Sequence, residues 1–120
     1  MRWGAKTGQE ALDQIIGSDE GAAMLGELAL VPQSSPISKS GILFYNTLFD
    51  ENASCHIALG KGFTNVIEGF ESMSDEEFGP LGVNDSMIHV DFMIGADDMT
   101  ITGKAQDGKE TPVFIGGEWA

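Results

Sequence analysis

The sequence predicts an α+β (mixed α/β) fold in which two N-terminal helices precede a mixed, mostly β region. Two observations support this prediction. Apolar residues near the N-terminus recur at helical spacing, whereas residues 87–94 place apolar side chains at every second position, as a strand does. The other apolar runs are short and are bounded by Gly, Pro, Ser and Asp, which is typical of strands and turns. A length of 120 residues fits one domain.

The helices are predicted from capping signals. Residues 7–10 (TGQE) have the pattern of a capping box, and the apolar residues of 11–16 then share one face. Gly17 stands where a left-handed C-terminal cap belongs. A second short helix is predicted over residues 18–25, because Ser and Asp at its start can cap it and a glycine follows it.

The strands are predicted from apolar runs without helical spacing. They comprise residues 27–31, ended by a proline, 42–45 as a buried strand or turn, 87–94, its partner 99–102, and 112–115. Between them the pattern predicts a loop at 32–41, helix or strand at 47–60, and a loop-rich stretch at 61–85 with a one-turn helix at 74–78.

The composition bears on the class of partner. Nineteen acidic residues against six basic ones give a formal net charge of −13, and the basic residues are scattered. Nucleic acid is therefore excluded as an expected partner. No apolar stretch has the length of a membrane span or of a signal-peptide core, and one cysteine cannot form an internal disulfide. We expect a soluble, cytoplasmic protein with no membrane partner.

Two ionisable residues interrupt the strand predicted at 87–94. His89 and Asp91 are two residues apart and therefore share a face, with their Cα atoms roughly 7 Å apart. One interpretation is an ordinary polar, solvent-exposed face. The other follows from the flanking Met87 and Met93, which indicate partial burial, because a buried Asp needs a hydrogen-bonded partner or a metal.

Two further residues have similar settings. His56 lies among small and apolar neighbours and fits a core histidine, while the adjacent Cys55 points away from it and fits a packing role. Glu27 opens an otherwise apolar strand and fits an edge position in water. Taken with His89 and Asp91, however, they form a workable ligand set for Zn, Co or Mn, and such sites often hold two metals.

One local segment resembles FKBP-type prolyl isomerases. Residues 59–62 (LGKG) followed by 67–71 (IEGFE) are similar to the LGKG…IPGFE stretch of that family. The resemblance covers about a dozen residues and lacks the proline. It implies prolyl isomerase activity as a third, alternative function.

A longer resemblance runs over nearly the whole chain. The blocks GELALVP, SPIS, GILFYNTLFDENASCHIALGKG, NDSMIHVDFMIG and GGEWA resemble the C-terminal part of the M29 metalloaminopeptidases, the family of aminopeptidases S and T. The resemblance implies that residues 1–120 are a single C-terminal fragment of the catalytic domain. The N-terminal domain and the start of the catalytic domain are then expected to be absent.

The resemblance also implies a chemistry. Members hydrolyse peptides from the N-terminus with a pair of divalent metals, and their ligands fall on Glu27, His56, His89 and Asp91, with one more Glu upstream of this chain. Glu27 or that missing Glu is implied as the catalytic proton carrier. Phe63 replaces a family Tyr, so no hydroxyl is expected on the oxyanion side of the site.

Two classes of function therefore stand beside the isomerase alternative. The first is a fragment of a metalloaminopeptidase that acts on peptide substrates and is inactive or weakly active alone. The second is a stable, non-catalytic module that lacks a complete metal site and self-associates as a homodimer, because uncovered apolar surface favours association.

Overall fold

The computed structural model describes residues 3–120, which divide into two compact units. The first unit runs to Leu28 and resumes over Ile57–Phe92, and the second comprises Ala29–His56 and Met93–Ala120. Short helices and two three-stranded sheets make up these units, which confirms the predicted α+β class. Within the described residues no helix is both long enough and apolar enough to cross a membrane.

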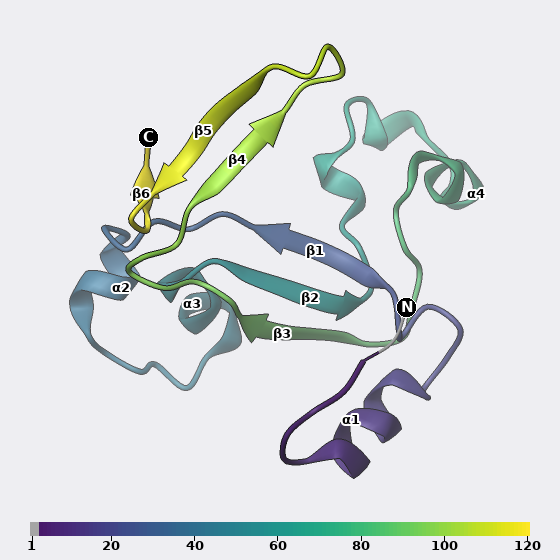
Figure 1. Ribbon diagram of the computed structural model, residues 1–120. Coiled ribbons are helices and arrows are strands. Elements are labelled where there is room, and N and C mark those ends of the chain that lie inside the picture. The colour runs from purple at the N-terminus through teal and green to yellow at the C-terminus, as the bar shows by residue number, and fades with distance from the viewer. Residues whose placement is uncertain (1–2) are drawn as a thin grey trace. The chain divides into compact units, whose positions relative to one another are not determined.

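The first sheet has the order β1-β2-β3 and lies almost wholly in the first unit. Its strands are β1 (Leu25–Ala29), β2 (His56–Gly60) and β3 (His89–Met93), and neighbouring strands run in opposite directions (Figure 1). Each strand carries one end residue beyond the unit boundary. The strand predicted at 87–94 is thus confirmed, shortened at both ends.

Helix α1 (Gln9–Ile16) confirms the first predicted helix, but its predicted capping is wrong. Gly8, in a left-handed conformation with φ 75°, is the N-cap, so Thr7 lies one residue too early for a capping box. At the other end Gly17 has φ −90° and is not a left-handed cap. The Gln9 side chain supports the helix start instead, since it accepts a hydrogen bond from the Ala5 amide at 2.7 Å.

The second predicted helix, over residues 18–25, is also wrong, because this segment forms turns that lead into β1. The carboxylate of Asp19 accepts hydrogen bonds from the Gly21 amide, the Ser86 hydroxyl and the Met87 amide. Gly21 packs so closely on the Asp85 backbone that a Cβ atom would overlap its carbonyl. These long-range contacts outweigh the local helix signal.

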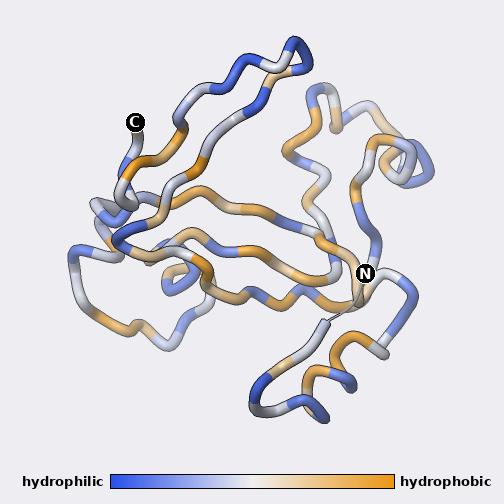
Figure 2. The backbone as a smooth tube through the Cα atoms, in the orientation of Figure 1, coloured by the Kyte–Doolittle hydropathy of each residue, from blue (hydrophilic) through white to orange (hydrophobic). Residues whose placement is uncertain are grey.

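The rest of the first unit is loop-rich, as predicted. The predicted one-turn helix is α4 (Asp75–Phe78), and the Glu77 carboxylate accepts from the Ser74 amide at 2.8 Å. This bond and the one from the Ser74 hydroxyl lower the pKa of Glu77. Single 3-10 turns occupy 64–66, 70–72 and 79–81. Helix α4 is hydrophilic in Figure 2, apart from the buried Phe78 that anchors it.

The second unit contains the β4-β5-β6 sheet, formed by β4 (Ile101–Lys104), β5 (Glu110–Ile115) and β6 (Glu118–Trp119). The prediction that 99–102 pairs with 87–94 is wrong, because β4 pairs antiparallel with β5, with Lys104 opposite Glu110. The turn between them is hydrophilic (Figure 2), whereas Phe114 is fully buried and packs on Trp119 at 4.5 Å between ring centroids. Alternation predicts a strand but not its partner.

Two helices of the second unit occupy segments that were predicted otherwise or left open. Helix α2 (Pro36–Ser40) lies in the predicted loop and begins at a Ser35 N-cap, while α3 (Thr47–Asp50) precedes the turn that leads into β2. Residues 42–45 are exposed and irregular, not buried. The Asp50 carboxylate accepts from the amides of Phe44 and Asn46, which fixes this segment without a strand partner.

The contacts of Asp19 predict that the stability of the fold depends on pH in the acid range. The Met87 amide lowers the pKa of Asp19 from its ordinary value of 3.8, helped by the Ser86 hydroxyl and the Gly21 and Ala22 amides against opposing desolvation. A lowered pKa stabilises the fold above the unfolded-state value and ceases to do so as pH falls through the folded value. Asp19→Asn should therefore lower the melting temperature at pH 7, with the difference from wild type shrinking below about pH 4.

Calorimetric or circular-dichroism melting curves at several pH values measure this difference. Glu20→Gln, the exposed neighbouring carboxylate, is the control and should leave the melting temperature unchanged. An Asp19→Asn difference that persists undiminished in acid would contradict the assignment.

Candidate metal centre

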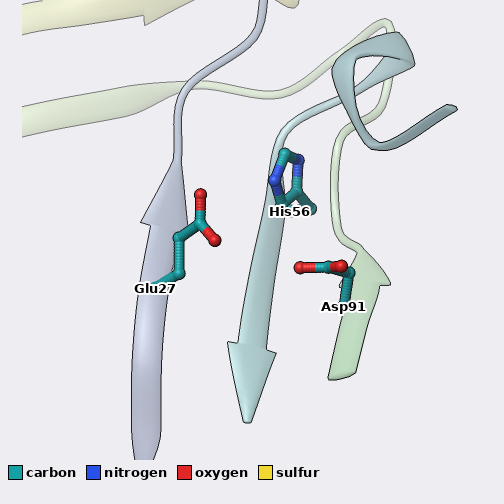
Figure 3. A group of neighbouring side chains, drawn as sticks. All are labelled: Glu27, His56 and Asp91. Carbon is teal, nitrogen blue, oxygen red and sulfur yellow. The ribbon is translucent and has the colours of Figure 1, made fainter. Parts of the chain in front are cut away.

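Each strand of the first sheet carries one ionisable side chain of a common group. Glu27 lies on β1, His56 begins β2 and Asp91 lies on β3, and Figure 3 shows the three side chains pointing toward one another. One ligand atom from each lies within 4.8 Å of the others. Adjacent strands are spaced about 4.8 Å apart, so residues at one level of one face meet in this way.

His89 lies against the two carboxylates of this group. It precedes Asp91 by two residues on β3 and therefore shares its face. Its Nε2 atom is 3.1 Å from Glu27 Oε2 and 3.2 Å from Asp91 Oδ1. The Asp91 side chain is only 7% exposed, and those of His89 and Glu27 are 23% and 25% exposed. The site is partly sheltered from water and open on one side.

A backbone carbonyl fixes the orientation of the His89 ring. His89 Nδ1 lies 2.7 Å from the Lys61 carbonyl oxygen, and because a carbonyl only accepts, Nδ1 carries the hydrogen and donates it. In the neutral ring the Nε2 atom then carries a lone pair. This lone pair faces one carboxylate oxygen of Glu27 and one of Asp91. Three acceptors that face one another need a positive species between them.

The burial of Asp91 adds to the same need. Within the described residues its Oδ1 atom is buried and has no hydrogen-bond partner, although His89 Nε2 lies 3.2 Å away. The short distance does not make a hydrogen bond, because a ring nitrogen without a hydrogen cannot donate. A buried acceptor left unsatisfied costs about 1–3 kcal/mol, and more when charged. A cation bound at this oxygen removes that cost.

His56 is held in a similar way. It is 2% exposed, and its Nδ1 atom lies 2.9 Å from the Ser54 carbonyl, to which it donates. Nε2 is then the atom that carries the lone pair. The neighbouring Cys55 has the predicted packing role, since its thiol donates to the Val31 carbonyl and accepts from the Val31 amide.

Phe63 covers one side of His89. The two ring centroids are 4.9 Å apart and the rings are tilted by 53°. Phe63 is 48% exposed and brings an apolar ring to the position where the family resemblance implies a Tyr. It packs against the imidazole and offers no hydroxyl.

The residues therefore fit a divalent cation. Two carboxylates and two imidazoles are typical ligands of Zn, Co and Mn, and each imidazole donates its other nitrogen to a backbone carbonyl, as metal-bound histidines usually do. All four residues singled out in the sequence lie in this group or against it. Sequence reasoning missed the Lys61 carbonyl, because a backbone oxygen leaves no signal in the residue pattern.

Comparisons with known proteins bear on this arrangement. The family profile described as thermophilic metalloprotease (M29) matches residues 1–119, a span that includes the LGKG segment. Aminopeptidase 2 from Geobacillus stearothermophilus and aminopeptidase AmpS from Bacillus subtilis are each 54% identical over 116 residues, 97% of this chain and 28% of those proteins. The structure of wild-type AmpT from Thermus thermophilus is similar with a TM-score of 0.81 and 45% identity, over 95% of this chain and 28% of that one. The chain thus spans 28% of these relatives.

Gly26 provides a test of how the ring of His89 is positioned. A Cβ atom at Gly26 would overlap the carbonyl oxygens of Gly60 and Lys61, so Gly26→Ala must displace the backbone that holds His89. We expect the affinity for zinc, measured by competition with a chromogenic chelator, to fall by about 10- to 100-fold, as for other changes behind a metal ligand.

Gly4→Ala is the matched control. The one atom within 4 Å of a Cβ atom there is Gln9 Oε1 at 3.9 Å, an ordinary van der Waals contact, so the extra methyl group should leave zinc affinity unchanged. A folded Gly26→Ala variant with wild-type affinity would show that the Lys61 carbonyl does not orient His89.

Proposed function

The chain belongs to the thermophilic metalloprotease (M29) family, and from this premise we propose that it is the C-terminal, metal-binding part of a divalent-metal-dependent aminopeptidase. The complete enzyme would hydrolyse the N-terminal residue from peptides. Relatives at 54% identity carry the name aminopeptidase, which supports the proposal.

One observation carries the proposal. The side chains of Glu27, His89 and Asp91 converge so that His89 Nε2 and two carboxylate oxygens face one another, and within the described residues Asp91 Oδ1 has no donor. Such an arrangement is costly in an apo protein unless a positive species binds there. Structural ion pairs do not require two imidazoles locked by backbone carbonyls.

We assign Glu27, His56, His89 and Asp91 as ligands of a divalent cation, Zn, Co or Mn, with a pair of ions in the complete enzyme and a further Glu supplied from outside this chain. A divalent cation at such a site supplies Lewis acidity that polarises a peptide carbonyl and activates water. His56 and His89 hold their Nε2 atoms toward it, and the apolar ring of Phe63 shields His89 from solvent.

Glu27 is our candidate for carrying the proton from water to the leaving amine. Its side chain is 25% exposed, whereas that of Asp91 is 7% exposed, so Glu27 is the carboxylate that substrate and water reach. The upstream Glu implied by the family is the alternative carrier. Because Phe63 has no hydroxyl, we expect no contribution from this residue to stabilising the oxyanion.

The first test is metal content. The 120-residue chain, incubated with zinc or cobalt and then desalted, should retain metal, and His89→Ala and Asp91→Asn should weaken binding by more than about a hundredfold. Asp98→Asn, which alters an exposed carboxylate in a turn, is the matched control and should retain wild-type metal content. Equal metal in wild type and both site variants would reject the ligand assignment.

The second part of this test concerns hydrolysis. Residues 1–120 can replace the matching segment of aminopeptidase 2 from Geobacillus stearothermophilus, to which they are 54% identical. The chimera should release leucine from a leucyl anilide only with added metal, and His89→Ala in it should abolish release. A folded, metal-loaded chimera without activity would reject the catalytic role of this chain.

The alternative function as a self-associating module rests on a different observation. Ile42, Leu43, Tyr45 and Leu48 are all more than half exposed within the second unit. We propose that the chain forms a homodimer through this apolar segment. We also propose a cytoplasmic location for the protein.

Sedimentation velocity tests the homodimer. The wild-type chain should sediment as a dimer, and Leu43→Lys, which places a charge in the segment, should shift it to the monomer. Val66→Lys, at an apolar position of the first unit that is also more than half exposed, should leave the dimer intact. A wild-type monomer at all concentrations would rule the dimer out.

A further inference from the structure

An apolar pocket opens directly beside the candidate metal centre. It has a volume of about 380 Å³ and lies wholly within the first unit. Its wall comprises Gly26, Glu27, Leu28, Gly62, Phe63, Val66, Ile67, Leu81, Gly82 and Val83. This volume is at the lower end of the range for small-molecule sites, which suits one amino-acid residue better than a long peptide segment.

Two residues belong to both the pocket and the metal centre. Glu27 lines the pocket, and its Oε2 atom lies 3.1 Å from His89 Nε2. Phe63 also lines the pocket, and its ring packs on His89. The pocket therefore adjoins the metal centre, and a ligand that fills the pocket contacts Glu27.

The chemistry of the wall selects the ligand. Glu27 is the one ionisable residue among the lining residues named above, and six of the others have apolar side chains. The wall therefore favours an uncharged, apolar group, with a positive charge at the end where Glu27 lies. Phe63, Val66 and Leu81 are each about half exposed or more, so a ligand enters from solvent and buries them.

We infer that this pocket binds the side chain of the first residue of the peptide substrate, with the free α-amino group beside Glu27, and that it selects large apolar residues. This inference rests on the proposed aminopeptidase function and adds to it the class of N-terminal residue. Leucine and phenylalanine at the substrate N-terminus gain by burial, whereas aspartate brings a second negative charge toward Glu27 and lysine loses its hydration.

The test measures binding, not turnover. Amino-acid amides, which carry the free amino group and the side chain, are titrated into the 120-residue chain by calorimetry. Burial of each methylene should strengthen binding about fourfold, so L-leucinamide should bind on the order of a hundred times more tightly than glycinamide. L-aspartamide should bind no more tightly than glycinamide.

A charge placed in the wall should reverse this preference. Val66→Asp should weaken L-leucinamide at least tenfold and strengthen L-lysinamide. Val66 is 75% exposed, so the substitution spares the core. Ile115→Asp, at a position 58% exposed in the second unit, is the control with unchanged binding. Equal affinities for leucinamide and glycinamide, or a preference unaffected by Val66→Asp, would overturn the inference.

The outcomes separate this inference from the proposed function. Metal binding and hydrolysis without selection of leucinamide would reject the pocket and keep the aminopeptidase. Selection of leucinamide that Val66→Asp reverses, together with a folded, metal-loaded chimera that hydrolyses no leucyl anilide, would support the pocket as an apolar subsite and reject the aminopeptidase function.

Discussion

The backbone of Gly60-Lys61-Gly62 is the constraint on which the candidate site depends. The Lys61 carbonyl accepts from His89 Nδ1, and the Lys61 amide donates to the Ile88 carbonyl, both at 2.7 Å. The end of β2 is thereby tied to the start of β3 through both backbone polar groups of one residue, Lys61. Gly60 has φ 94°, and a Cβ atom there would overlap the Ile88 carbonyl, so this crossing requires glycine.

The same stretch receives support from two further segments. Asn84 donates its side-chain amide to the Gly60 carbonyl at 2.6 Å, and its own carbonyl accepts from the Gly62 amide. The Gly60 amide donates to the Met24 carbonyl, just before β1. Because the three residues make bonds to three other parts of the first unit, the Lys61 oxygen has a fixed position, and so has the ring that donates to it. Because the Lys61 oxygen is fixed, the ring of His89 keeps one orientation although its side chain is 23% exposed.

Local pattern predicted much of this unit and failed where distant contacts decide. The alternation at 87–94 predicted the strand and placed His89 and Asp91 on one face, because side-chain period follows from backbone geometry alone. Residues 18–25 had helix signals, yet the Asp19 carboxylate binds the Met87 amide 68 residues away. Two other errors were local: β4 pairs with the next strand, β5, and the Asp50 carboxylate binds the Phe44 amide only six residues away. In both cases the sequence pattern left the partner open.

The sequence indicated which side chains could form the candidate site, and the structure places them together. The burial argument drew attention to His89 and Asp91, whereas Glu27 and His56 also fitted an exposed edge and a core histidine. The assignment of all four as ligands came from the family resemblance and stays a prediction. The carbonyl that orients His89 and the pocket that adjoins Glu27 depend on backbone approach and on loops 62–67 and 81–83, whose apolar residues have no period. The metal centre and the pocket are linked through the chain that follows Lys61. Phe63, two residues on, packs against His89 and also lines the pocket. A change in the path of this crossing would therefore alter metal affinity and side-chain selection together, because the Lys61 carbonyl that holds His89 and the Phe63 wall of the pocket are two residues apart in one strand end.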